Sequence, residues 1–160
     1  LEFTIKSYRD HDGVTNALWD LVPGDRLLLR DVWGTITYGG PGIFIAGGAG
    51  VTPFIAILRR LHQDGTLAGN RLIVSNRTAA DIILRNEFEA MQDLEHLWTL
   101  TDDPGAADVL HERIDEAFLR RHVSDISQRF YLCGPDQMVK DLRGALEGLG
   151  ASAETIIWEK

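Results

Sequence analysis

The sequence predicts an α/β protein with a doubly wound parallel sheet, preceded by the remnant of an antiparallel β-barrel. From residue 43 onwards, short apolar strands alternate with amphipathic helices, and this alternation requires parallel strands with helices on both faces. The first of these strands runs into a glycine-rich turn and a helix, which is typical of anion-binding turns in such sheets. Residues 1–38 contain no strand–helix–strand unit, so we assign them to a different domain.

The composition is that of an ordinary globular protein. The chain has 160 residues, of which 44% are hydrophobic and 25% charged, so it is long enough to bury a core. Sixteen basic against twenty-four acidic residues give a net charge of −8, which argues against nucleic acid or an anionic membrane as main partner. Cys133 is the only cysteine, which favours a reducing, cytoplasmic compartment. No apolar run has the length of a membrane span, and the histidines lack metal-ligand spacing.

The first 38 residues are expected to form the end of a β-barrel domain. Residues 1–8 alternate between apolar and polar side chains as a strand does, and residues 26–32 form a second strand-like stretch after a turn. The segment from Val14 to Leu21 has the spacing of a short helix. Glycines and a proline in residues 38–42 then mark a linker. The predicted domains are therefore 1–38 and 39–160.

The second domain is predicted to contain five strands and four helices. Each predicted strand is a short apolar run of the kind that is buried on both faces of a parallel sheet. Each predicted helix has apolar residues at helical spacing. The strands are 43–47, 70–76, 96–101, 128–133 and 154–158, and the helices are 53–63, 81–91, 111–122 and 135–148.

The turn after the first strand, GGAGVTP, is the first candidate binding site. Its glycines, Gly47, Gly48 and Gly50, leave the backbone open to close approach by a ligand. Thr52 stands where a helix N-cap is expected, and Pro53 where the first helical residue is expected. Such a helix start offers free N–H groups and a positive dipole end to an anion such as a diphosphate. The alternative is a tight turn that binds nothing.

The loop after the second strand is the second candidate site. In dinucleotide-binding sheets, this strand end carries an acidic residue that binds the adenosine ribose. Here the strand ends in Ser75, Asn76, Arg77 and Thr78, and Asp81 opens the next helix. Asp81 and Arg77 could equally be a helix-start charge and a solvated surface cation.

The third candidate site follows the fourth strand of the sheet. Cys133 ends this strand at the carboxyl edge, where ligands bind in open α/β sheets. Gly134 and Pro135 then turn the chain into a helix whose first apolar residue is Met138. A lone cysteine in this place could also be a small packing residue.

Together these motifs resemble the ferredoxin–NADP reductase superfamily, which includes NADH-cytochrome b reductases and flavodoxin reductases. GGAGVTP resembles its pyridine-nucleotide turn, residues 76–85 its adenosine-binding loop N-x-T-x-x-D-I-L/I-L-R, and CGP its nicotinamide-side motif. The resemblance covers nearly the whole chain. It implies a flavin-dependent oxidoreductase that uses NAD(P)H and FAD, with hydride transfer from the nicotinamide to the flavin. Single electrons then pass to a carrier protein such as flavodoxin, ferredoxin or a cytochrome.

The resemblance also implies roles for individual residues. Cys133, Thr52 and Glu159 are the candidate catalytic residues, with Cys133 lying against the nicotinamide and not acting as a nucleophile. Asp81 would oppose the 2′-phosphate of NADPH and so favours NADH, whereas Arg77 would attract that phosphate. The candidate residues for binding the pyridine nucleotide are Gly47, Gly48, Gly50, Thr52, Pro53, Ser75, Asn76, Arg77, Thr78, Asp81, Cys133, Gly134, Pro135 and Met138.

A further match concerns FAD. Gly13, Val14 and Thr15 match the G-x-x-S/T element that binds the FAD diphosphate in this superfamily. The upstream R-x-Y-S-like strand that holds the flavin ring has no counterpart in the sequence. Two interpretations therefore stay open. One is an oxidoreductase of which this chain carries only part of the flavin domain. The other is a non-catalytic nucleotide-binding or electron-transfer-subunit module that lacks its own flavin.

Overall fold

The computed structural model describes residues 2–7, 10, 12–31 and 34–159, which fall into two compact units, Leu1–Gly34 and Thr35–Lys160. The boundary lies between residues 34 and 35, whereas the linker composition placed it between 38 and 39. Tyr38 belongs to the second unit because its ring stacks on Phe44 and Tyr131, with centroids 6.3 and 5.9 Å away. The units are described separately below.

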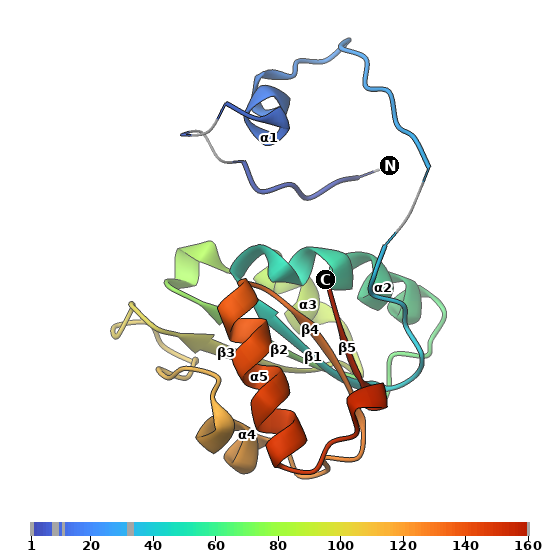
Figure 1. Cartoon of the computed structure of the whole chain (residues 1–160). Helices are drawn as coiled ribbons and strands as arrows, with labels where there is room; N and C mark the ends of the chain where they lie inside the picture. Colours follow the sequence, from blue (N-terminus) through green and yellow to red (C-terminus); the bar gives the residue numbers. More distant parts are fainter. Residues whose placement is uncertain (1, 8–9, 11, 32–33, 160) are drawn as a thin grey trace. The chain divides into compact units, whose positions relative to one another are not determined.

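The second unit contains a parallel sheet of five strands in the order β3-β2-β1-β4-β5 (Figure 1). The chain builds outwards from β1 to β3 and then returns to place β4 on the other side of β1. This reversal confirms the predicted doubly wound sheet, and the crevice outside the carboxyl ends of β1 and β4 is where such sheets bind ligands. The strands are β1 (Gly42–Gly47), β2 (Arg71–Asn76), β3 (Glu95–Leu100), β4 (Arg129–Cys133) and β5 (Ile156–Trp158).

Helices cover both faces of this sheet (Figure 1). One face packs against α2 (Thr52–Gln63) and α3 (Arg85–Ala90), and the other against α4 (Glu116–His122) and α5 (Asp136–Gly148). Short 3-10 turns connect the elements: η2 (Gly48–Val51), η3 (Ala79–Asp81) and η4 (Ala153–Thr155). No helix in the part of the chain that the structure describes is long and apolar enough to cross a membrane.

The core lies on both faces of the two central strands. Phe44 of β1 and Tyr131 of β4 are paired in register and stack at 4.4 Å between ring centroids on the α2 side. Their neighbours Ile45 and Leu132 point to the α5 side, and all four side chains are fully buried. Since both faces exclude water, most positions of these strands favour an apolar side chain. This is why the strands were visible as continuous apolar runs.

The predicted helix 81–91 is wrong in its first half. Residues Ala79–Asp81 form the separate turn η3, whose Asp81 carboxylate accepts hydrogen bonds from the Thr78 backbone N–H and hydroxyl. Leu84 then has a left-handed φ of 54°, which interrupts any helix. For this reason α3 begins only at Arg85.

The predicted helix 111–122 also begins later than expected. The Asp115 side chain accepts a hydrogen bond from the Phe118 backbone N–H at 2.8 Å and so caps α4. An N-cap residue has extended backbone angles, and Asp115 shows them with φ −123° and ψ −173°. The helix therefore starts at Glu116.

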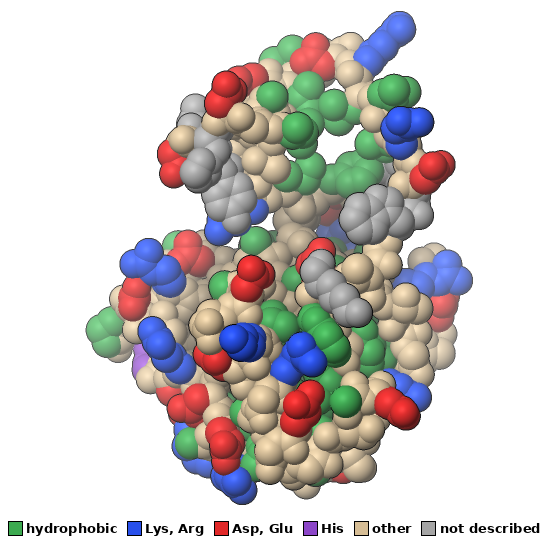
Figure 2. Space-filling model, viewed as in Figure 1, with side chains coloured by type: hydrophobic (Ala, Val, Ile, Leu, Met, Phe, Trp, Pro, Cys, Tyr) green, Lys and Arg blue, Asp and Glu red, His purple; other side chains and the backbone are tan. Residues whose placement is uncertain are grey.

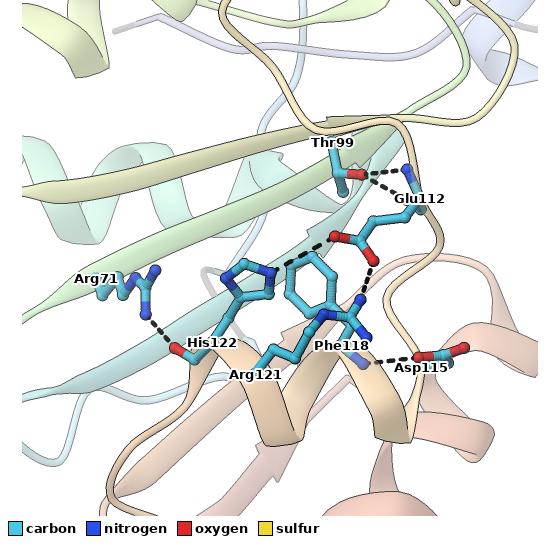
Figure 3. A network of polar contacts seen from close by, with 7 residues as sticks. All are labelled: Arg71, Thr99, Glu112, Asp115, Phe118, Arg121 and His122. Atoms are coloured by element: carbon cyan, nitrogen blue, oxygen red, sulfur yellow. Dashed lines mark hydrogen bonds and ion pairs between the residues drawn. The ribbon is translucent and has the colours of Figure 1, made fainter.

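Polar contacts fasten the segment before α4 to the sheet (Figure 3). The Thr99 hydroxyl of β3 donates to the Glu112 carbonyl oxygen, and the Glu112 N–H donates back to that hydroxyl at 3.3 Å. The Glu112 carboxylate lies between Arg121 and His122 of α4. Arg71 of β2 donates to the His122 carbonyl oxygen. These contacts hold the segment before α4 to β3 and the C-terminal end of α4 to β2.

The first unit differs from the prediction. The expected strands 1–8 and 26–32 do not form in the described residues 2–7 and 26–31; positions 1, 8 and 32 lie outside the described residues. A strand needs a neighbour for its backbone hydrogen bonds, and no strand pairs with these segments in the described part of the chain. The expected short helix forms as α1 (Val14–Ala17) followed by η1 (Leu18–Asp20).

No side chain is buried in the described residues of the first unit. Hydrophobic side chains instead gather on its surface (Figure 2). The exposed large hydrophobic residues are Phe3, Ile5, Val14, Trp19, Leu21, Val22, Leu27, Leu28 and Leu29. This unit therefore lacks a hydrophobic core of its own within the described residues.

Candidate functional site

The turn after β1 leaves an open surface at one glycine. Gly48 has a φ of +53°, which favours glycine, and a Cβ at this position would meet nothing within 4 Å. The backbone then winds through η2 into α2 without a break. Thr52 is therefore not the N-cap that the sequence predicted: it is the first residue of α2, already helical at φ −57° and ψ −44°, and no side chain caps this helix. The η2–α2 start directs backbone N–H groups towards the carboxyl edge of the sheet.

The other two glycines of the turn are packed. A Cβ on Gly50 would lie 2.2 Å from the Cys133 carbonyl oxygen and 2.6 Å from the Gly134 nitrogen. A Cβ on Gly47 would lie 2.5 Å from the Met138 sulfur and 2.8 Å from Pro135 Cδ. A side chain at residue 50 would therefore meet the end of β4. The turns after β1 and β4 lie in direct contact across the switch point.

Cys133 is buried at the end of β4, with 6% of its surface exposed. Its thiol donates a hydrogen bond to Glu159 Oε2 at 3.1 Å, just beyond β5. Burial, and then the hydrogen bond and charge of Glu159, raise the pKa of the Cys133 thiol to about 12. The thiol therefore stays protonated near neutral pH and serves as a weak donor and a small apolar surface, because a nucleophilic cysteine needs its thiolate. The structure brings together Cys133 and Glu159, which the sequence placed 26 residues apart.

The loop after β2 closes on itself. Ser75 is paired with Gly47 in the sheet register, which places the loop beside the glycine turn. The buried Asn76 donates from Nδ2 to the Asp81 carbonyl oxygen at 2.8 Å. The Asp81 carboxylate accepts from Thr78 at 3.0 Å (N–H) and 2.8 Å (hydroxyl). Asp81 thus acts as a local cap, in addition to any role towards a ligand.

The sequence analysis did not identify Asp102 and Asp103 as residues of this region. The Arg77 guanidinium donates from Nε to Asp102 Oδ2 at 2.8 Å. The Ala79 backbone N–H donates to Asp103 Oδ2 at 3.1 Å. Both carboxylates follow β3, the strand beside β2. Their place at the carboxyl end of a third parallel strand was the one signal that could have revealed them.

Gly13, Val14 and Thr15 belong to the first unit and not to the sheet. Gly13 is the N-cap of α1 and has no side-chain cap; its carbonyl oxygen accepts from the Asn16 and Ala17 backbone N–H groups. The expectation that these three residues bind the FAD diphosphate stays a prediction.

The family model described as "Oxidoreductase NAD-binding domain" matches residues 44–144, which is more than half of the chain. The chain belongs to this family. The matched part contains the glycine turn, the loop after β2, Cys133 and Met138. Glu159 and the first unit lie outside the matched part of this oxidoreductase NAD-binding domain.

Relatives of this NAD-binding domain are larger proteins. The reductase component of propane 2-monooxygenase from Mycolicibacterium goodii is 27% identical, over 99% of this chain and 49% of that protein. NADH-cytochrome b5 reductase 2 from Rattus norvegicus is 27% identical, over 93% of this chain and 64% of that protein. The chain thus spans about half to two thirds of these relatives' length. The cytochrome b5 reductase domain of Ulva prolifera nitrate reductase shares the fold, with a TM-score of 0.79 and 24% identity over 96% of this chain and 70% of that one.

Proposed function

We propose that this chain is the nucleotide-binding part of an FAD-dependent NAD(P)H oxidoreductase that passes electrons to a one-electron carrier protein. The observation that supports it is the contact between two turns: the η2 turn after β1 lies against Cys133 and Gly134 after β4. This contact sits at the switch point of a parallel sheet, where dinucleotides bind in doubly wound folds. The open surface at Gly48 and the protonated thiol of Cys133 then lie on one edge.

The chain's own groups are suited to a dinucleotide. Backbone N–H groups of η2 and the dipole of the twelve-residue α2 would hold a diphosphate. Gly48 leaves room for it, because no atom lies within 4 Å of the position of a Cβ. Cys133 and Glu159 would orient the nicotinamide. Pro135 and Met138 pack against Gly47 and would keep water from that side of the turn. The bound cofactors supply the redox chemistry, a hydride from NAD(P)H to FAD followed by single electrons to the carrier.

The first unit would complete a flavin-binding domain, with Gly13, Val14 and Thr15 at the FAD diphosphate. Its apolar side chains are exposed, with Leu28 at 92%, and an apolar surface of this kind belongs against other protein. The relatives' greater length is consistent with a flavin domain of which this unit is only one part. A carrier such as a cytochrome, ferredoxin or flavodoxin would receive the electrons.

Calorimetric titration of the chain with NADH and NADPH tests the nucleotide site. Gly48→Ala should weaken binding of the preferred nucleotide at least about tenfold, or roughly 1.4 kcal/mol, because a methyl group enters the diphosphate path. Gly65→Ala is the matched control, since Gly65 also has a left-handed φ of +66° and its Cβ also meets nothing within 4 Å, but it lies after the other end of α2. Circular dichroism should show both variants folded. A wild-type chain that binds neither nucleotide contradicts the proposal.

The alternative is a nucleotide-binding module without a flavin of its own. The absence of buried side chains in the described part of the first unit favours it for the chain taken alone. The two functions differ in the purified protein: bound flavin absorbs visible light and is reduced by NAD(P)H, whereas a flavin-free module is colourless and binds the nucleotide without oxidising it.

A further inference from the structure

The edge strand β5 is short and ends beside the candidate nucleotide site. Its last paired position joins Trp158 to Leu132 of β4, and among the described residues no strand pairs with its other side. The next residue after Trp158 is Glu159, which is exposed and whose carboxylate accepts the hydrogen bond from the Cys133 thiol at 3.1 Å. The sheet pairing therefore stops one residue short of the carboxylate that contacts Cys133.

Trp158 and Glu159 serve opposite faces of the sheet, because successive side chains of a strand alternate. Trp158 packs with the hydrophobic cluster on the α5 side, as its partner Leu132 does. Cys133 belongs to the cluster on the α2 side, and Glu159 reaches it there. Since the two residues are neighbours in the chain, a movement of the backbone that displaces the Trp158 ring also displaces the Glu159 carboxylate.

Arg143 of α5 holds the Trp158 ring from outside. Its guanidinium carbon lies 3.5 Å from the ring centroid, and a cation over an indole face is attracted by the π electrons of the ring. The Arg143 Nε is buried and has no hydrogen-bond partner in the described part of the chain. The ion pair between Arg143 and Glu147, one turn further along α5, is long at 3.8 Å. The indole face is therefore a closer contact of this guanidinium than the Glu147 carboxylate.

We propose that Arg143 and Trp158 are positioning residues, whose stack fixes the end of β5 and so holds the Glu159 carboxylate at the Cys133 thiol. Both residues act through Glu159, and neither needs to touch a ligand. The inference rests on the proposed function only in its consequence for the nicotinamide, which the Cys133–Glu159 pair would contact. The hydrogen bond of that pair forms without a nucleotide, so it can be measured separately.

Infrared spectroscopy of the S–H stretching band tests the positioning role. Cys133 is the only cysteine, so this band reports on one thiol, and a hydrogen bond donated by the thiol lowers its frequency. Glu159→Ala gives the band of the thiol without this acceptor. Arg143→Ala and Trp158→Leu should each move the wild-type band most of the way to that position. Trp158→Phe keeps an aromatic face for the cation and should keep the wild-type band. Circular dichroism should show every variant folded.

Three variants separate the stack from a general loss of charge or stability. Glu147→Gln removes the ion pair of Arg143 and leaves the stack. Arg120→Ala removes an arginine of a similar pair, with Glu116 on α4 at 2.7 Å. Both should keep the wild-type S–H band. In a Glu159→Ala background, Arg143→Ala should shift the band no further, because the residue through which it acts is gone.

Calorimetric titration tests the consequence for the nicotinamide. The probes are NADH, NADPH and ADP-ribose, which lacks the nicotinamide ring. Arg143→Ala should bind ADP-ribose within about twofold of wild type, because the stack lies away from the η2 turn. The ratio of dinucleotide affinity to ADP-ribose affinity should change in Arg143→Ala by the same factor as in Glu159→Ala.

Each outcome bears on one part of the inference. An unchanged S–H band in either folded variant, Arg143→Ala or Trp158→Leu, overturns the positioning role. A shifted band with an unchanged ratio of dinucleotide to ADP-ribose affinity overturns the consequence for the nicotinamide. A wild-type chain that binds neither NADH nor NADPH overturns the proposed function and that consequence with it, while the S–H band still decides whether the stack holds Glu159.

Discussion

The Cα of Gly50 lies against the carbonyl group of Cys133, so closely that a Cβ at residue 50 would come within 2.2 Å of the carbonyl oxygen. The residues are distant in sequence: Gly50 lies in the η2 turn after β1, and Cys133 is the last residue of the neighbouring strand β4. This contact fixes the spacing between the η2 turn and the end of β4. The η2 turn and the end of β4 are the two parts of the candidate nucleotide site, so the geometry of the site depends on that spacing.

Gly50→Ala should destabilise the fold, because neither backbone can move away from the added methyl group without disturbing the sheet. Overpacking of this kind costs about 1–3 kcal/mol of unfolding free energy. Gly48→Ala should cost about 1 kcal/mol, through its left-handed φ alone. Urea unfolding of both variants checks the order. Equal stability of Gly50→Ala and wild type would contradict the packed contact.

The Cys133 thiol should react slowly with an alkylating reagent at pH 8. Because its folded pKa is about 12 against an ordinary 9.0, the folded chain holds about a thousandfold less thiolate than the unfolded chain. The rate of iodoacetamide labelling, read by mass spectrometry, should rise at least a hundredfold in urea. This cysteine is the only one in the sequence, so one labelled mass reports on it directly.

The same pKa shift predicts how stability depends on pH. A thiol with a raised folded pKa contributes its stability fully below the unfolded value of 9.0, and loses it as the pH rises towards about 12. The unfolding free energy should therefore fall by up to about 1.4 kcal/mol per pH unit in this window. Cys133→Ser should flatten this part of the profile. An identical slope in the variant would assign the pH dependence to other groups.

Cys133→Ser should leave nucleotide affinity within an order of magnitude of wild type. The thiol lies beside Glu159 and not among the η2 backbone groups proposed to hold the diphosphate. In the flavin-containing enzyme, the rate of flavin reduction by the nucleotide should fall. The serine hydroxyl would bond to Glu159 in place of the thiol, and this changes the surface that contacts the nicotinamide. Stopped-flow absorbance measures that rate, and an unchanged rate would leave Cys133 with a packing role only.

Tyr131→Phe should weaken the attachment of residues 39–40, which lie just before β1, to β4. The Tyr131 hydroxyl donates to the Gly40 carbonyl oxygen at 2.7 Å and accepts from the Gly39 N–H at 3.0 Å. Removing it leaves both partners without this hydrogen bond, at a cost of about 1–3 kcal/mol. Hydrogen exchange at the Gly39 amide should accelerate while the amides of β4 stay protected. Equal acceleration throughout would indicate global destabilisation instead.

Asp115→Ala should cost about 0.5–2 kcal/mol of unfolding free energy, because it removes the N-cap of α4. Asp136→Ala is the control: Asp136 is also an acidic residue at a helix start, but α5 has no side-chain cap hydrogen bond. Thermal unfolding should separate the two variants. Equal losses would mean that charge at the helix start matters and the specific cap does not.

The strands of the sheet and the longest helices could be read from the sequence. All five strands lie within about two residues of their predicted places, and the helices α2 and α5 within one. Burial on both faces of the sheet leaves a continuous apolar run, and burial on one face of a helix leaves a periodic one. Both patterns are local, so they survive in a single sequence. The glycine turn and Cys133 could be located because each stands at the end of such an apolar strand.

Only the tertiary structure decided what each of these residues touches. Of the glycines in the turn, Gly50 packs on β4, Gly47 packs on α5, and Gly48 alone faces open space. Asp102 reaches Arg77, and Glu159 reaches Cys133, across 25 and 26 positions of sequence. The predicted strands of the first unit did not form in its described residues. In every case the outcome depends on a partner distant in the chain, and side-chain spacing within one segment carries no information about such a partner.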